Sequence, residues 1–125
     1  MMPMEKNKIR RSTEIATRYF DFLDQHIDDV VNGDVSDFFE LNRIARELTI
    51  SHKHLTDIIK TEKGHHPCHF YDAKIISKAQ ELLTTSDLSI AQIAMKLTYD
   101  PSNFSKFFKK WTGFTPGEYR NEKQK

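Results

Sequence analysis

A chain of 125 residues with 38% hydrophobic and 30% charged side chains has the size of one globular domain, and this composition excludes global disorder. It contains no apolar run of the roughly 18 residues that span a membrane, and its start, MMPMEKNKIRR, lacks the apolar segment of a secretion signal. We therefore expect one compact cytoplasmic unit with no membrane contact. The single cysteine, Cys68, cannot form an intramolecular disulfide, which fits a reducing compartment.

The net charge of +1 conceals an uneven distribution along the chain. Residues 1–11 carry a net charge of +3, residues 12–48 carry −6, residues 49–95 are balanced, and residues 96–125 carry +4. A basic segment can attract polyanions even when the whole chain is nearly neutral. We expect residues 1–11 to form a flexible basic segment, residues 12–121 to form the compact unit, and residues 122–125 to form a tail.

Apolar residues recur with helical spacing and no segment alternates like a strand, so the sequence predicts an all-α fold. The first long helix is predicted to follow a cap at Ser12 or Thr13 and to end before the NGD turn of residues 32–34. A short second helix is predicted near residues 41–48. The third covers residues 52–63, between the cap Ser51 and Gly64, a residue suited to the left-handed conformation that follows a helix.

The second half of the chain predicts four more helices. A linker helix covers residues 67–85, with Pro67 in its first turn, where the missing N–H costs nothing. Ser89 and Gln92 form a capping box for a fifth helix over residues 90–97, and Asp100 caps a sixth over residues 101–111. A second capping box over residues 115–118 begins a short seventh helix near Tyr119.

An internal repeat is the most informative feature of the sequence. Moving the chain by 49 residues places residues 41–70 on residues 90–119 without a gap. Each copy contains a short helix with an Ile-Ala pair, a tight polar turn and a longer helix with an exposed polar face. That is the helix-turn-helix pattern, in which the second helix can lie in the DNA major groove. Ala45 and Ala94 provide the small side chain that two crossing helices need.

The segments LSIAQIAMKL (88–97), FSKFFKKWTGFTPGEYR (104–120) and AKIISKAQELL (73–83) make the chain similar to the AraC/XylS family of bacterial transcriptional regulators. The resemblance covers residues 12–120. It implies a seven-helix DNA-binding domain in which residues 12–66 hold the first helix and the first helix-turn-helix, and residues 86–121 hold the second helix-turn-helix and the last short helix. The linker helix 67–85 joins the two. The two recognition helices, about residues 52–63 and 101–111, would enter successive segments of the major groove, with double-stranded operator DNA as the partner.

The resemblance also implies which side chains contact DNA, and lysine suits phosphate contacts because it is a compact point charge. The base-contact candidates are His52, Lys53, Thr56, Asp57, Ser102, Asn103, Ser105 and Lys106. The phosphate-contact candidates are Arg43, Ser51, Lys60, Lys74, Lys109 and Lys110. In the family the domain usually follows a separate effector-sensing domain, and we expect no effector site within this chain.

The sequence departs from the family pattern at three points. Asp57 stands where a basic or amide side chain is common; its carboxylate could accept from a cytosine amino group or repel the DNA backbone. Thr98 stands where the turn usually has glycine, and the second turn is one residue shorter than usual. The last two departures affect the tilt of the sixth helix.

Two other functions are weighed against DNA binding. The cluster HHPCH (65–69) suggests zinc ligands, but the other copy has no metal ligands in the same loop, so we expect no metal site. His66 then substitutes for a cap, and His65 is a partly buried filler. The sequence contains no glycine-rich phosphate-binding loop of the kind found in many enzymes, and we expect neither catalysis nor a cofactor.

The alternative function is a protein-interaction module. The −6 charge of residues 12–48 includes Asp24, Asp28 and Asp29 on the first helix, and this surface could bind RNA polymerase or a sensor partner, with DNA contact secondary.

Overall fold

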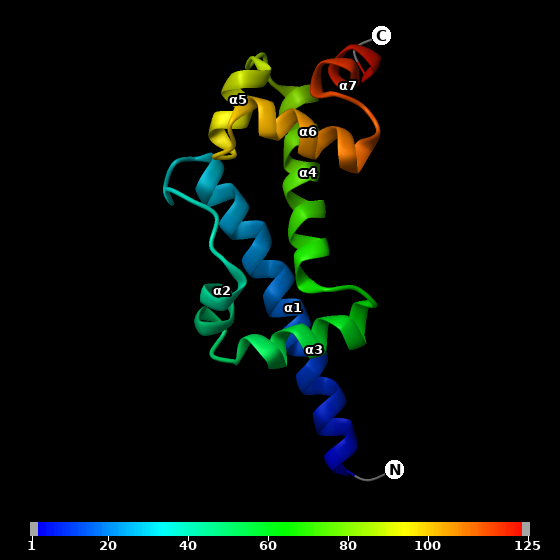
Figure 1. Ribbon diagram of the computed structural model, residues 1–125. Coiled ribbons are helices and arrows are strands. Elements are labelled where there is room, and N and C mark those ends of the chain that lie inside the picture. Colours follow the sequence, from blue (N-terminus) through cyan, green and yellow to red (C-terminus); the bar gives the residue numbers. More distant parts are fainter. Residues whose placement is uncertain (1–2, 124–125) are drawn as a thin grey trace. The chain divides into compact units, whose positions relative to one another are not determined.

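The computed structural model describes residues 3–123, which contain helices and connecting loops and no strand (Figure 1). The helices are α1 (Pro3–Val31), α2 (Leu41–Glu47), α3 (His52–Lys63), α4 (Pro67–Thr85), α5 (Ile90–Lys96), α6 (Pro101–Thr112) and α7 (Pro116–Lys123). The all-α prediction is confirmed. Over the same residues, no helix combines the length and apolarity needed to cross a membrane. Two compact units form, residues 3–25 with 39–71 and residues 26–38 with 72–123, so α1 and α4 each contribute to both.

The start of α1 differs from the prediction. The helix begins at Pro3 rather than after Ser12 or Thr13, so residues 3–11 continue it. Pro3 occupies the first helical position, where a missing N–H costs nothing, and the residues that follow are mostly good helix formers without glycine. Ser12 and Thr13 are therefore helix-interior residues. The C-terminal end agrees with the prediction, because α1 ends at Val31 and Gly33 has φ +84°.

The first unit has an apolar core between α1, α2 and α3, and the two shorter helices lie beside α1 (Figure 1). The crossing residue Ala45 is only 1% exposed, as its small size predicts. Tyr19 is fully buried, and its hydroxyl donates to the Pro67 carbonyl at 2.9 Å, so its polar end is satisfied. The core is completed by Ile15, Leu23, Leu41, Ile44, Leu48, Leu55, Ile58 and Ile59.

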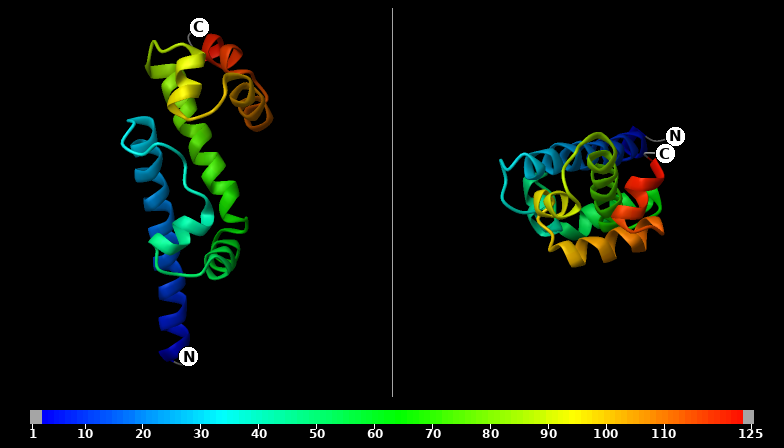
Figure 2. Two further views of the ribbon diagram at one scale, coloured as in Figure 1. Left: turned by 60° about the vertical axis from the view of Figure 1, so that its left-hand side comes forward. Right: turned by 90° about the horizontal axis from the view of Figure 1, so that it is seen from above.

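The second unit groups α5, α6 and α7 around the C-terminal part of α4 (Figure 2). The aromatic residues Phe104, Phe107, Phe108 and Trp111 recur along α6 at helical spacing as a stripe, and Phe104 and Phe108 are fully buried in the core. Phe107 and Trp111 are only partly buried, because they lie at the edge of that stripe; Phe107 stacks on Tyr99 with 5.3 Å between ring centroids. The rest of the core includes Ile27, Val30, Ile75, Ile76, Ala79, Leu83, Ile93, Ala94 and Leu97.

Local capping explains where the later helices begin. Ser89 and Gln92 form the predicted capping box, with N–H···O distances of 2.8 and 3.0 Å. Thr115 and Glu118 form the same reciprocal pair at the start of α7, at 2.9 and 3.1 Å. The hydrogen bond from the Thr115 N–H lowers the pKa of the Glu118 carboxyl below its ordinary value, and the Thr115 side chain has a smaller effect in the same direction. Each box satisfies donors that the helix itself leaves without partners.

The turns of the two helix-turn-helix units have the same unusual conformation. Thr49 and Thr98 are the non-glycine residues with positive φ among residues 3–123, and both have φ +60°. A β-branched residue seldom adopts this left-handed conformation. In each turn the threonine N–H donates to the carbonyl three residues earlier, and the next N–H donates five residues earlier: Thr49 to Arg46, Ile50 to Ala45, Thr98 to Met95 and Tyr99 to Ala94, all at 2.9–3.0 Å. Both units therefore end their first helix with the same Schellman motif.

Candidate nucleic-acid interface

Helix α3 presents its polar residues on one side and buries Leu55, Ile58 and Ile59 on the other. Of the four base-contact candidates on this helix, His52, Lys53 and Asp57 are exposed and Thr56 is partly exposed. Lys53 and Asp57 form an ion pair one helical turn apart, with 3.0 Å between Nζ and Oδ2. The carboxylate that departs from the family pattern thus neutralises a lysine of the same face. An exposed pair of this kind contributes only about 0.3–0.5 kcal/mol, so its separation costs little.

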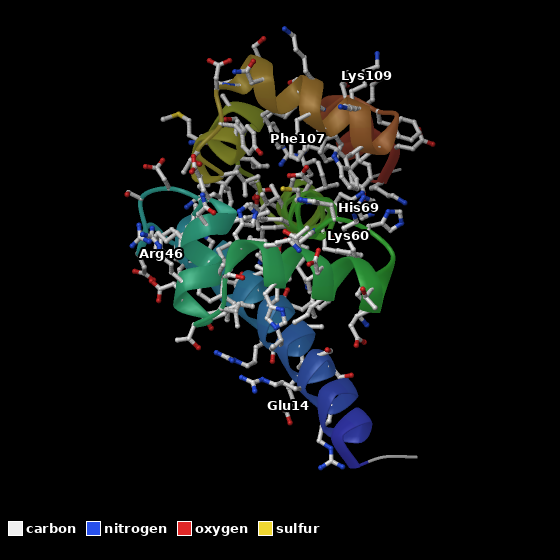
Figure 3. All side chains as sticks on the ribbon, turned by 60° about the horizontal axis from the view of Figure 1, so that its bottom comes forward. Glu14, Arg46, Lys60, His69, Phe107 and Lys109 are labelled. Atoms are coloured by element: carbon white, nitrogen blue, oxygen red, sulfur yellow. The ribbon has the colours of Figure 1, made fainter. Side chains whose placement is uncertain are left out.

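Helix α6 presents a face of different charge. Ser102, Asn103 and Lys106 are exposed and Ser105 is partly exposed, while Phe104 and Phe108 fix the opposite face in the core. Residues 101–112 contain three lysines and no carboxylate, whereas residues 52–63 contain three lysines and two carboxylates. Helix α6 is therefore more basic than α3. Figure 3 shows Lys109 projecting from α6 on the side opposite to Phe107.

The phosphate-contact candidates differ in how open they are. Ser51, Lys60, Lys109 and Lys110 are exposed, and Lys74 on α4 is partly buried. The guanidinium of Arg43 lies 3.7 Å from the centroid of the Phe39 ring, which holds this exposed side chain in place. At the start of α6 the Asp100 carboxylate accepts from Ser102 and Asn103 N–H groups at 3.0 and 3.2 Å. That carboxylate occupies the position a phosphate would take.

The histidine cluster of residues 65–69 makes local contacts at the start of α4. His66 Nδ1 accepts from the Cys68 N–H at 3.0 Å, which confirms its predicted role as a substitute cap. The prediction for His65 is wrong, because the ring is exposed and stacks on His69 at 4.3 Å instead of filling the core. Between residues 3 and 123, no three His, Cys, Asp or Glu side chains come together as metal ligands would.

Four arginines near the first turn were not among the predicted contacts. Arg46 is exposed in the last turn of α2, and Arg10, Arg11 and Arg18 are exposed on α1 (Figure 3 labels Arg46). Arg18 Nη2 donates to the Leu48 carbonyl at 3.3 Å, next to the left-handed Thr49. The positive charge of residues 1–11 was visible in the sequence, but the approach of α1 to this turn depends on tertiary packing.

Comparison with known proteins agrees with this architecture. The profile of a family described as a helix-turn-helix domain, of the AraC type, matches residues 44–122, more than half of the chain. The chain belongs to the AraC-type helix-turn-helix family. The matched residues include the turns at Thr49 and Thr98 and the helices α3 and α6 that follow them.

Relatives of the AraC-type chain include two transcriptional regulators of Bacillus subtilis. YtdP is 31% identical over 103 residues, which cover 82% of this chain and 13% of that protein. YfiF is 29% identical over 119 residues, covering 95% of this chain and 35% of that protein. The chain therefore spans about a third or less of the length of these relatives.

A solved AraC-type structure supports the fold directly. The C-terminal domain of AraT, a response regulator from Geobacillus stearothermophilus, has a TM-score of 0.74 and 30% identity, covering 86% of this chain and 84% of that one. The DNA-binding domain of the transcription factor AdpA, solved with a target DNA, has a TM-score of 0.64, with 78% of this chain and 91% of that one covered. Its 22% identity makes it evidence for the fold alone.

Proposed function

We propose that this chain is a sequence-specific, double-stranded DNA-binding domain of a bacterial transcriptional regulator, acting in the cytoplasm. Helices α3 and α6 are the two readers and enter successive major-groove segments. The observation that supports this function best is the duplicated helix-turn-helix, in which Thr49 and Thr98 end the first helix of each unit with the same motif. Because the two turns have the same hydrogen bonds and the same left-handed residue, we expect each reader to be held by its preceding helix in a similar way.

The division of roles between side chains follows from their positions. Ser102, Asn103 and Lys106 lie in the first half of α6, and His52, Lys53 and Thr56 lie in the first half of α3, the part of a recognition helix that reaches base edges. Lys60, Lys109 and Lys110 lie further along and suit phosphates. Asn103 is matched to adenine by its amide, and Lys106 to the acceptors of guanine.

A mobility-shift titration tests the function. The probe is a duplex selected by the protein from a random pool, and affinity should fall with a slope near −0.9 per phosphate neutralised as log salt concentration rises. Absence of binding, or binding without salt dependence, would contradict the proposal.

Substitution of Lys106 tests the role of α6. Lys106→Ala should weaken the selected duplex by about 1–3 kcal/mol and spare a scrambled one if the ammonium reads a base. The matched control is Lys110→Ala on the same helix, which should weaken both duplexes alike. Equal losses on both duplexes for both variants would remove Lys106 from the base-reading set.

A protein partner such as RNA polymerase is a second proposal, motivated by the acidic stretch of residues 12–48. Asp28 is less suited to it, because Lys78 Nζ lies 2.8 Å from its Oδ1 and joins α1 to α4 within the second unit. Hydrogen bonds to the carboxylates of Asp28, which has the larger effect, and Glu81 raise the pKa of Lys78. Asp24→Lys, with Asp28 retained, should leave DNA affinity unchanged and reduce activated transcription; unchanged transcription would refute this role.

A further inference from the structure

The first unit contains a basic cleft that the proposed function does not yet use. Its volume is about 440 Å³, and residues of α1 line one side while the turn before α3 lines the other. The lining residues are Arg10, Arg11, Glu14, Ile15, Arg18, Thr49 and Ile50. Three arginines and one glutamate line the cleft, so the formal charges of its lining residues sum to +2.

We propose that this cleft binds the DNA backbone phosphates that flank the groove occupied by α3. The proposal rests on the DNA-binding function proposed above and extends it to α1. Guanidinium groups suit this role because their planar donors match the oxygens of a phosphate in pairs.

The position of the cleft carries the inference. Thr49 and Ile50 line it and immediately precede Ser51, which caps α3 by accepting from His54 N–H at 3.1 Å. A recognition helix enters the major groove by its N-terminal end, so the residues just before α3 face the phosphate strand that borders that groove. All the lining residues belong to the same compact unit as α3, so the cleft keeps its position relative to this reader.

The chemistry of the turn leaves phosphate binding to the arginines. Thr49 and Ile50 N–H groups already donate to carbonyls of α2, and the His54 N–H donates to Ser51. Arg18 is anchored by its bond to the Leu48 carbonyl, and a guanidinium has five donors, so one such bond leaves others available. Glu14, which also lines the cleft, lies between Arg11 and Arg18 in the sequence of α1 and offsets one of the three positive charges.

The test compares Arg10→Gln/Arg11→Gln with the unaltered protein on two versions of the selected duplex. One version extends about one helical turn beyond the part read by α3, and the other is trimmed at that end. On the long duplex the variant should lose up to about 60-fold in affinity at 0.1 M salt. This value assumes that each of two phosphate contacts adds −0.9 to the slope of log affinity against log salt concentration and contributes nothing at 1 M salt. On the trimmed duplex the two proteins should bind alike.

Controls separate this outcome from general effects. Arg10→Lys/Arg11→Lys keeps both charges and should retain most of the affinity, and circular dichroism should show that all variants have the helix content of the unaltered protein. If the unaltered protein binds no duplex, the proposed function itself fails. If it binds but the Gln variant loses less than threefold in affinity, or loses equally on both duplexes, the proposal that the cleft binds the DNA backbone is overturned.

Discussion

Replacing Thr98 with glycine should stabilise the second unit, although it removes a side chain. The left-handed conformation costs a non-glycine residue about 1–2 kcal/mol, and Thr98 has φ +60°. Glycine avoids that cost but loses about 0.5–1 kcal/mol more backbone entropy on folding. The expected net gain is therefore about 0.5–1 kcal/mol, which corresponds to an increase in melting temperature of about 2–6 °C.

The assay uses the only tryptophan of the chain. Trp111 lies on α6 in the second unit, so its fluorescence during urea unfolding reports the stability of the unit that contains Thr98. DNA affinity should not change, because glycine keeps the φ angle that orients α6. A decrease in the unfolding free energy of Thr98→Gly would refute the reasoning, since it would mean that the strain relieved is smaller than the backbone entropy lost.

Thr49→Gly is the matched control in the first unit. Its φ is the same, but its hydroxyl donates to the Leu48 carbonyl at 2.6 Å. Loss of this hydrogen bond costs about 0.5–1.5 kcal/mol, so the gain from relieving strain should be cancelled or reversed. Circular dichroism should therefore show a smaller or negative effect for Thr49→Gly, and a larger gain than for Thr98→Gly would contradict the comparison.

Three further predictions concern charge, pH and capping. Asp57→Asn releases Lys53 and should strengthen binding to unselected duplex DNA, measured by fluorescence anisotropy. The slope of log affinity against log salt concentration should become steeper by about 0.9. Weaker binding would count against repulsion of DNA by Asp57. The pKa of the Glu118 carboxyl is lowered, so its stabilising contribution exists above the ordinary glutamate pKa and is lost as pH falls through the folded value. The protection of the Thr115 amide, taken relative to its intrinsic exchange rate at each pH, should therefore decrease over this range in the unaltered chain and not in Glu118→Gln. His66→Ala should destabilise the first unit by about 1 kcal/mol in urea unfolding while His66→Asn preserves the cap; equal losses would exclude a capping role.

Local rules explain why most of the helices could be predicted from the sequence. The third helix was predicted over residues 52–63 and occurs there, because Ser51 and Gly64 fix both of its ends through nearby hydrogen bonds. The capping boxes at Ser89 and Thr115 were found for the same reason. The early start of α1 was missed because Ser12 and Thr13 look like caps but are compatible with a helix interior when good helix formers precede them.

The parts of the site that escaped prediction depend on other physics. The Lys53–Asp57 pair follows the i,i+4 rule and could have been found from the sequence. The intrinsic preference of threonine opposes the left-handed conformation, and the signal for it was indirect: Thr98 stands where the family's turn usually has glycine, and Thr49 is its equivalent in the repeat. Arg18 reaches Leu48 across 30 positions of sequence, so only tertiary packing brings the α1 arginines to the first reader.

The Lys53–Asp57 pair also has a consequence for how the protein would search a genome. A reader whose lysine is occupied by its own carboxylate holds arbitrary DNA weakly, and proteins locate their sites by sliding and hopping along arbitrary DNA. The genome offers about a million or more competing positions, so brief residence at each of them matters as much as a long residence at the right one. In the proposed function, the cost of separating this weak surface pair would shorten residence on wrong sites, while the more basic α6 would supply most of the attraction to DNA of any sequence.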